Sequence, residues 1–255
     1  MTSPAAAAIL QARRARQLLA PLGADAPADI AAGYAVQREV AAALGALPPA
    51  GYKIGATGRQ MQSYLGIAEP IAGFIEQRHI LQSPAAPRFA DFISPGVEPE
   101  VALRLGRDLP HGPCSRAEAA AAVAEVFAAV EIVENRYGDF RTVSAPTLVA
   151  DQMFHAAGAV GAPAAGWREA DLGAIRGRIT VNGALRGEGV GADLLGHPFE
   201  ALAWLARSPA AAAFGGLKAG QVVFLGSVTP PVWLDGPGEV VAEFDVLGRV
   251  ELRFG

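Results

Sequence analysis

The dipeptide Asn182-Gly183 sets the tightest limit on what this chain can fold into. It separates two short runs of β-forming residues, 179–181 and 184–186. An Asn-Gly pair in that setting predicts a two-residue turn in which both residues take positive φ. Such a turn joins neighbouring strands that run in opposite directions. The pairing at this point is therefore expected to be antiparallel.

Apolar periodicity predicts further strands and helices on both sides of this turn. Apolar runs predict strands at 52–55, 98–105, 130–133, 221–225, 240–244 and 250–254. Helical spacing predicts helices at 5–19, 29–44, 59–65, 115–128 and 197–206, with Asp29 and Ser115 as N-caps and Glu118 completing a capping box. At the proline-rich stretch 83–87 we expect a small α/β N-terminal section, 1–82, to meet a β-rich core, 83–255.

The composition fits one folded unit of enzyme size. Of the 255 residues, 51% are apolar and 18% are charged, which is enough to bury a substantial core. The net charge of −4 is mild and the basic residues are scattered, which argues against a nucleic-acid partner. Cys114 is the single cysteine, so no intramolecular disulfide can form, as is usual in a reducing compartment.

The N-terminal stretch does not have the order of a secretory signal. Arg13, Arg14 and Arg16 follow the first apolar run, whereas a signal peptide has its basic residues before it. No stretch reaches the ~18 apolar residues that a membrane span requires. We therefore expect a soluble cytoplasmic protein with no membrane partner.

Two glutamates share one face of a predicted strand. Residues two apart on a strand point the same way, so in VEPEVAL the side chains of Glu98 and Glu100 project from one face and Val101 lies on the other. Pro99 cannot donate a hydrogen bond to a neighbouring strand, so we expect it at a sheet edge or near the beginning of its strand.

A third glutamate, Glu131, interrupts a short apolar run. Burying an unpaired carboxylate costs several kcal/mol, so it needs a cation or a strong hydrogen-bond donor. Three converging carboxylates would suit magnesium, manganese or calcium, because one cysteine and four scattered histidines do not supply zinc-type spacing. The alternative is a solvated acidic strand face, with Glu131 paired to Arg104 or Arg136.

Other polar residues have both a functional and a structural interpretation. Lys53, in GYKIG, is a candidate proton donor or acceptor, or else a surface lysine. Ser227 and Thr229 follow a predicted strand, where they could bind a substrate carboxylate or form a plain proline-ended turn. His155 and His197 are interpreted as packed or capping histidines.

Six segments of the chain follow one another in a characteristic order and spacing: GYKIGATG, VEPEVALRLGRDLP, AVEIVENRYGDF, LVADQMFHAAGAVG, VNGALRGEGVGADLLGHPFEALAWLA and FLGSVTPPVW. Together they resemble the hydratase and decarboxylase branch of the fumarylacetoacetate hydrolase superfamily. The resemblance covers the chain from about residue 51 onward. It implies an α+β fold with a mixed β-roll or sandwich core, which would be the catalytic core, and a small α/β N-terminal section. It also implies a homo-oligomer, with an aldolase or a decarboxylase of the same pathway as a possible partner.

The resemblance further implies a set of site residues. The family's E-x-E metal ligands fall on Glu98 and Glu100, its third acidic ligand on Glu131 and its active-site lysine on Lys53. The bound ion would be Mg2+ or Mn2+. Asp151 is added to the catalytic residues, because it could orient water or Lys53, with a helix cap as the alternative.

Enzymes of this branch act on 2-oxo or 2-hydroxydienoic acids from the meta-cleavage breakdown of aromatic compounds. The resemblance therefore implies a hydratase that converts a 2-hydroxydienoate or 2-oxo-alkenoate into a 4-hydroxy-2-oxo acid. In this hypothesis the metal holds the C1 carboxylate and C2 oxygen of the substrate and stabilises an enolate, and Lys53 shuttles a proton.

Three positions depart from the pattern of the hydratases. Ile71 stands where they tend to have an acidic residue, which is more like the oxalocrotonate decarboxylases. Glu134 and Gln152 replace the usual aspartate and asparagine. The alternatives are a decarboxylase or an acylpyruvate-type carbon–carbon hydrolase on the same scaffold, and a non-catalytic protein that binds 2-oxo acids.

Overall fold

The computed structural model describes residues 2–255 and places most of the strands in one large curled sheet. In this described part of the chain the sheet has eight strands in the order β2-β1-β9-β4-β5-β6-β3, with β10 paired to β4. The strands are β1 Gly51–Gly55, β2 Ile71–Ile75, β3 Ile80–Gln82, β4 Pro95–Leu105, β5 Val123–Glu134, β6 His155–Val160, β9 Val222–Ser227 and β10 Val232–Trp233. β1 runs parallel to β9 and β3 runs parallel to β6, whereas the other neighbours are antiparallel.

A second, antiparallel sheet packs against the large one. Its order is β12-β11-β7-β8, and its strands are β7 Arg176–Val181, β8 Ala184–Val190, β11 Gly238–Phe244 and β12 Gly248–Phe254. The predicted hairpin is confirmed, because Asn182 and Gly183 join β7 to β8 with φ values of 50° and 78°. β11 and β12 contact β5 of the large sheet.

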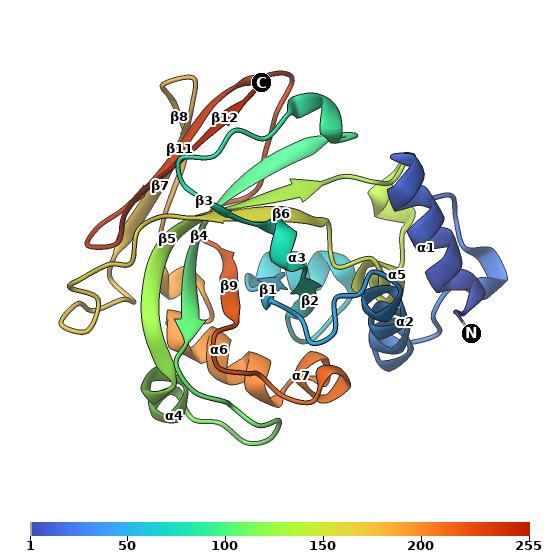
Figure 1. Ribbon diagram of the computed structural model, residues 1–255, viewed down its shortest axis with the longest axis horizontal. Coiled ribbons are helices and arrows are strands. Elements are labelled where there is room, and N and C mark those ends of the chain that lie inside the picture. The colour runs from blue at the N-terminus through green and yellow to red at the C-terminus, as the bar shows by residue number, and fades with distance from the viewer. Residues whose placement is uncertain (1) are drawn as a thin grey trace.

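Most of the helices lie at the end of the molecule away from the second sheet or below the large sheet in the view of Figure 1. They are α1 Pro4–Ala15, α2 Ile30–Ala43, α3 Arg59–Leu65, α4 Arg116–Ala121, α5 Ala145–Ala150, α6 Pro198–Arg207 and α7 Pro209–Phe214. Short 3₁₀ helices cover Gly23–Asp25, Gln77–His79, Phe89–Asp91, Phe140–Thr142 and Gly191–Asp193. α2 packs against both α1 and α5. None of the helices described in residues 2–255 combines the length and the apolar character that a bilayer crossing requires.

The helix predicted over 115–128 is wrong in its second half. Ser115 and Glu118 form the predicted capping box, but α4 ends at Ala121 and β5 begins two residues later. The alanines there favour a helix locally. β5 pairs with β4 along nearly its whole length, and this long-range pairing outweighs the local propensity.

Two smaller predictions are also wrong. The first helix ends at Ala15, before Leu19, because Arg16 takes a left-handed φ of 52°. Pro99 lies inside β4, not at an edge, between β5 on one side and β9 and β10 on the other. Its carbonyl accepts a hydrogen bond from the Val228 N–H at 3.2 Å, just after β9 has ended. In a strand, the N–H and the carbonyl of one residue point to the same side. On that side of Pro99 the neighbouring strand is interrupted between β9 and β10, so the N–H that a proline lacks is not needed there.

The α+β class is confirmed, and the sheet spans the predicted boundary near residue 83. β1 pairs with β9, and β3 pairs with β6, so strands from residues 1–82 and from residues 83–255 belong to one sheet. The division of the chain into residues 1–82 and 83–255 stays a proposal, and both sections contribute strands to the same sheet.

The large sheet has the main core on one face and a small apolar cluster on the other. This inner cluster consists of Ile75, Ala102, Phe127, Ala129, Val160, Val222 and Phe224. Further along the same face of β4 and β5, Glu100 lies opposite Ala129 and Glu98 lies opposite Glu131. The inner cluster therefore continues directly into a row of carboxylates.

Replacing Gly158 with alanine should destabilise the protein by about 1–3 kcal/mol. Gly158 lies on β6 opposite Glu131, and a Cβ atom there would lie 2.3 Å from the Phe224 ring, which would have to leave its place in the inner cluster. Denaturant unfolding of Gly158→Ala measures the loss. Gly138→Ala is the control, because a Cβ atom there would meet nothing within 4 Å. Equal midpoints for the two variants would contradict this packing.

Candidate metal centre

Glu98, Glu100 and Glu131 lie together on the inner face of the large sheet, as predicted. One carboxylate oxygen from each residue lies within 4.8 Å of one from the other two. Glu100 and Glu131 are fully buried and Glu98 is half-buried. The Gly226 N–H donates to Glu100 Oε2 at 3.0 Å. The alternative of a solvated strand face is therefore wrong.

Lys53 reaches the same cluster from β1. Its Nζ atom donates to the Met153 carbonyl at 2.9 Å and lies 3.3 Å from Glu131 Oε1, and the side chain is 2% exposed. A Cβ atom at Gly55 would lie 3.2 Å from this Nζ, so the small residue leaves room for the ammonium group. The interpretation of Lys53 as a surface lysine is wrong.

The arginines that were considered as partners of Glu131 pair elsewhere. Arg104 Nε donates to Glu125 at 2.8 Å, and Arg136 Nε donates to Asp151 at 2.9 Å. Neither arginine therefore pairs with Glu131. Its carboxylate is stabilised instead by Lys53 and by a histidine.

That histidine is His155, which the sequence analysis interpreted as a packed or capping histidine and did not connect with Glu131. Its Nδ1 atom lies 2.7 Å from Glu131 Oε1, and the side chain is buried. Because an ionised carboxylate only accepts hydrogen bonds, Nδ1 carries the proton and Nε2 is left without a partner among residues 2–255. Burial lowers the pKa of His155, in keeping with a neutral ring. His197, in contrast, caps α6 by accepting from the Phe199 N–H at 3.0 Å, so its capping interpretation is confirmed.

The negative charge of the cluster is only partly balanced. Burial and repulsion from Glu131 raise the pKa of Glu98 to about 8, and burial and the neighbouring carboxylates raise the pKa of Glu100 well above its usual value. Burial acts on Glu131 too, but Lys53 and His155 hold its pKa below the usual range. Within the described residues, Glu100 Oε1 and Glu131 Oε2 are buried without a hydrogen-bond partner. Oxygen donors with this excess of charge fit a hard divalent cation such as Mg2+ or Mn2+.

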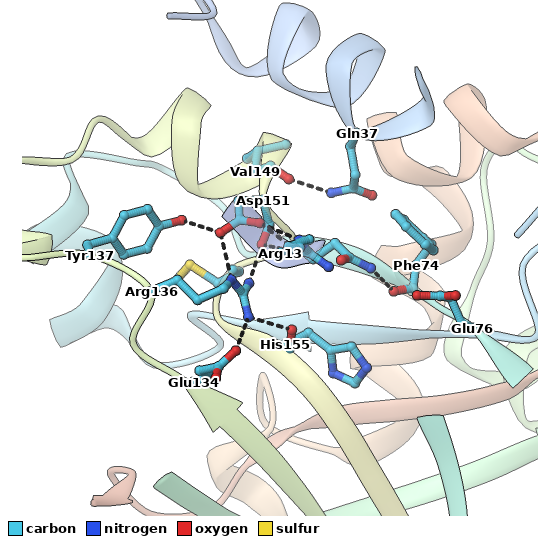
Figure 2. A network of polar contacts seen from close by, with 12 residues as sticks. Arg13, Gln37, Phe74, Glu76, Glu134, Arg136, Tyr137, Val149, Asp151 and His155 are labelled. Atoms are coloured by element: carbon cyan, nitrogen blue, oxygen red, sulfur yellow. Dashed lines mark hydrogen bonds and ion pairs between the residues drawn. The ribbon is translucent and has the colours of Figure 1, made fainter. Parts of the chain in front are cut away.

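Asp151 belongs to a separate network, shown in Figure 2. Its Oδ1 atom accepts from Arg13 Nε at 2.8 Å, and its Oδ2 atom accepts from Arg136 Nε and from the Tyr137 hydroxyl, each at 2.9 Å. Burial opposes ionisation, but the two guanidinium groups hold the pKa of Asp151 below its usual value. Lys53 Nζ contacts the Met153 carbonyl and Glu131, not Asp151, so a direct hold on the lysine is not seen, and a catalytic role for Asp151 stays a prediction. The residue is the C-cap of α5, as the structural alternative proposed.

The hydroxyls of Ser227 and Thr229 are used within their own turn. Ser227 lies opposite Glu100 in the pairing of β4 with β9, and its Oγ atom donates to the Thr229 carbonyl at 2.6 Å. Thr229 Oγ1 donates to the Pro230 carbonyl at 3.0 Å. The interpretation as a turn is confirmed, and a role in substrate binding stays a prediction for both residues.

Comparison with known proteins relates the chain to one family. Residues 68–254 match the family model described as fumarylacetoacetate (FAA) hydrolase C-terminal. A protein named 2-keto-4-pentenoate hydratase from Paraburkholderia phymatum is 32% identical over 253 residues, which cover 98% of this chain and 95% of that protein. A protein named 4-oxalocrotonate decarboxylase from a Pseudomonas species is 32% identical over 202 residues, which cover 78% of this chain and 76% of that protein.

A solved structure is similar over the whole fold. It is 4-oxalocrotonate decarboxylase from Pseudomonas putida G7 complexed with magnesium and adipate, with a TM-score of 0.91 and 26% identity over 100% of this chain and 97% of that chain. The same protein has also been solved complexed with calcium and acetate. The mixed sheet and its helices therefore match an experimentally known architecture.

Proposed function

Because this chain belongs to the fumarylacetoacetate hydrolase family, we propose that it is a metal-dependent hydratase of a 2-hydroxydienoate or 2-oxo-alkenoate in aromatic meta-cleavage catabolism. The product would be a 4-hydroxy-2-oxo acid. The proposal depends above all on the buried cluster of Glu98, Glu100 and Glu131, in which two oxygens have no partner among residues 2–255. The names of the similar proteins support the reaction class.

Glu98, Glu100 and Glu131 are the residues that would hold the ion, with Mg2+ or Mn2+ as the proposed species. When bound, the ion supplies positive charge that stabilises negative charge developing on the substrate oxygen atoms. The magnesium in the similar decarboxylase structure supports this assignment. His155 holds Glu131 through Oε1, so that Oε2 is left for the ion.

Lys53 is the proposed proton carrier. An ammonium group has three N–H donors. One is directed at the Met153 carbonyl, and a second is within reach of Glu131 Oε1. The third has no acceptor among residues 2–255, and we assign it to holding or delivering a proton at the substrate. The buried position excludes competing water from this step.

Ile71 favours a decarboxylase as the second candidate. Its side chain is 1% exposed and lies across from Gly55 in the pairing of β1 with β2. Gly55 is itself next to Lys53 Nζ. An isoleucine transfers no proton, so a reaction that needs a second acid here would be disfavoured.

The test is turnover by the purified protein with and without Mg2+. For the hydratase we expect a metal-dependent loss of ultraviolet absorbance from 2-hydroxypenta-2,4-dienoate without release of carbon dioxide, stopped by a chelator. Carbon dioxide from 2-oxohex-3-enedioate would select the decarboxylase, and cleavage of an acylpyruvate would select the hydrolase. If the protein binds these acids but does not turn them over, it is a non-catalytic binding protein.

We further propose that the protein is a homo-oligomer. Light scattering on the same preparation tests this proposal.

A further inference from the structure

A turn of uncommon backbone geometry joins α5 to β6 beside the proposed metal centre. Its residues Gln152, Met153 and Phe154 have φ values of 62°, 46° and 65°. Three consecutive residues with side chains therefore take the left-handed conformation, which is disfavoured for each of them. Such a backbone persists only where its surroundings hold it in place.

This left-handed turn, residues 152–154, positions two functional side chains at once. The Met153 carbonyl accepts from Lys53 Nζ at 2.9 Å. His155 follows the turn directly and lies 2.7 Å from Glu131 Oε1. A shift of the turn would therefore move the proposed proton carrier and a proposed metal ligand together.

Arg13 holds the start of the turn from a distant part of the chain, as Figure 2 shows. Its guanidinium group donates to Asp151 Oδ1 at 2.8 Å through Nε and to the Asp151 carbonyl at 3.0 Å through Nη2. Arg136 and Tyr137 bond the other carboxylate oxygen, and Arg136 also donates to the Asp151 carbonyl at 2.8 Å, so within residues 2–255 it is Oδ1 that has Arg13 as its hydrogen-bond donor. Arg13 belongs to α1, which lies outside the family match at 68–254. The contact between Arg13 and Asp151 therefore uses a residue that lies outside the matched family segment.

We propose that Arg13 is a positioning residue that fixes the left-handed turn and, through it, Lys53 and Glu131. The inference rests on the proposed function, which takes Glu131 as a metal ligand and Lys53 as the proton carrier. The planar guanidinium fork binds the carboxylate and the carbonyl of Asp151 together, which a lysine ammonium cannot do with the same geometry. Arg14, the next residue of α1, is exposed and forms no ion pair within residues 2–255, so it is a matched control.

The experiment is calorimetric titration with Mn2+ together with steady-state kinetics at saturating Mn2+. For Arg13→Ala we expect one ion per folded chain, an affinity weakened by about 10-fold to 100-fold, and a lower kcat with little change in KM. Arg13→Lys should lie between Arg13→Ala and the wild type. Arg14→Ala should match the wild type in every measurement.

The folded fraction, measured by circular dichroism without metal, separates positioning from simple stabilisation of the fold, because unfolded chains weaken the apparent affinity in proportion to that fraction. If Arg13 only stabilises the fold, Arg13→Ala will show the affinity and kcat of the wild type once both are corrected for its folded fraction, and the inference is overturned. Wild-type affinity and kcat in a fully folded Arg13→Ala variant would overturn it as well. A wild-type protein that binds no Mn2+ would instead remove the proposed function, and the inference with it.

Discussion

Replacing Glu100 with glutamine should abolish metal-dependent activity and leave the metal-free protein as stable as the wild type or more stable. Glutamine keeps an oxygen that can accept from the Gly226 N–H, so the backbone contact at 3.0 Å survives. It removes one of three carboxylates whose oxygens lie within 4.8 Å of one another. Burial and the neighbouring carboxylates raise the pKa of Glu100 well above its usual value. The ionised form of Glu100 therefore destabilises the metal-free folded state.

The affinity for Mn2+ should fall by more than about 100-fold, since the loss of a residue that merely supports a ligand already costs about 10-fold to 100-fold. Thermal melts with and without Mn2+ measure both effects. The metal-dependent rise in Tm should vanish, and the metal-free Tm should stay equal or rise by a few degrees, at roughly 2–4 °C per kcal/mol. Glu125→Gln is the control, because it is also a strand glutamate, is 38% exposed and pairs with Arg104. A Glu100→Gln variant with its metal shift intact would contradict the proposed ligand set.

The alternation of residues along a strand was enough to predict the main part of the site. It put Glu98 and Glu100 on one face without reference to any other segment. The apolar surroundings of Glu131 predicted burial and a compensating partner, and its side chain is indeed buried beside Lys53 and His155. These predictions succeed because they depend on geometry within single strands and on the cost of burying charge.

The remaining features depend on long-range contacts that no local pattern encodes. Glu98 faces Glu131 because β4 and β5 pair in one particular register, and that pairing also overrode the predicted helix over 115–128. His155 has no neighbour in sequence that would distinguish it from a packed histidine. Arg13 meets Asp151 across 138 positions of the chain, so a sequence pattern around either residue gives no sign of the contact.

Replacing Lys53 with methionine should lower turnover by about 10²-fold to 10⁴-fold, the usual contribution of a proton-transferring side chain. Methionine has a similar length and fits the buried space, so the change removes the charge and the donors while keeping most of the packing. The variant loses the contacts with the Met153 carbonyl and with Glu131 Oε1. Its kcat should therefore fall even when the metal site is saturated.

Metal binding should respond in the opposite direction to that expected for Glu100→Gln. Lys53 and a bound divalent cation both balance the charge of Glu131, so removal of the lysine leaves a site with more uncompensated negative charge. Lys53→Met should bind Mn2+ at least as tightly as the wild type, and its metal-free form should lose about 3–5 kcal/mol of stability because Glu131 keeps its charge but loses a cationic partner. The bound ion should restore part of that loss, which melts with and without Mn2+ would show.

Lys218→Met is the control, because Lys218 is the only other lysine of the chain and pairs with Asp108 at the surface. Full turnover by Lys53→Met would rule out Lys53 as the proton carrier, and weak Mn2+ binding by it would show that the lysine supports the metal site itself.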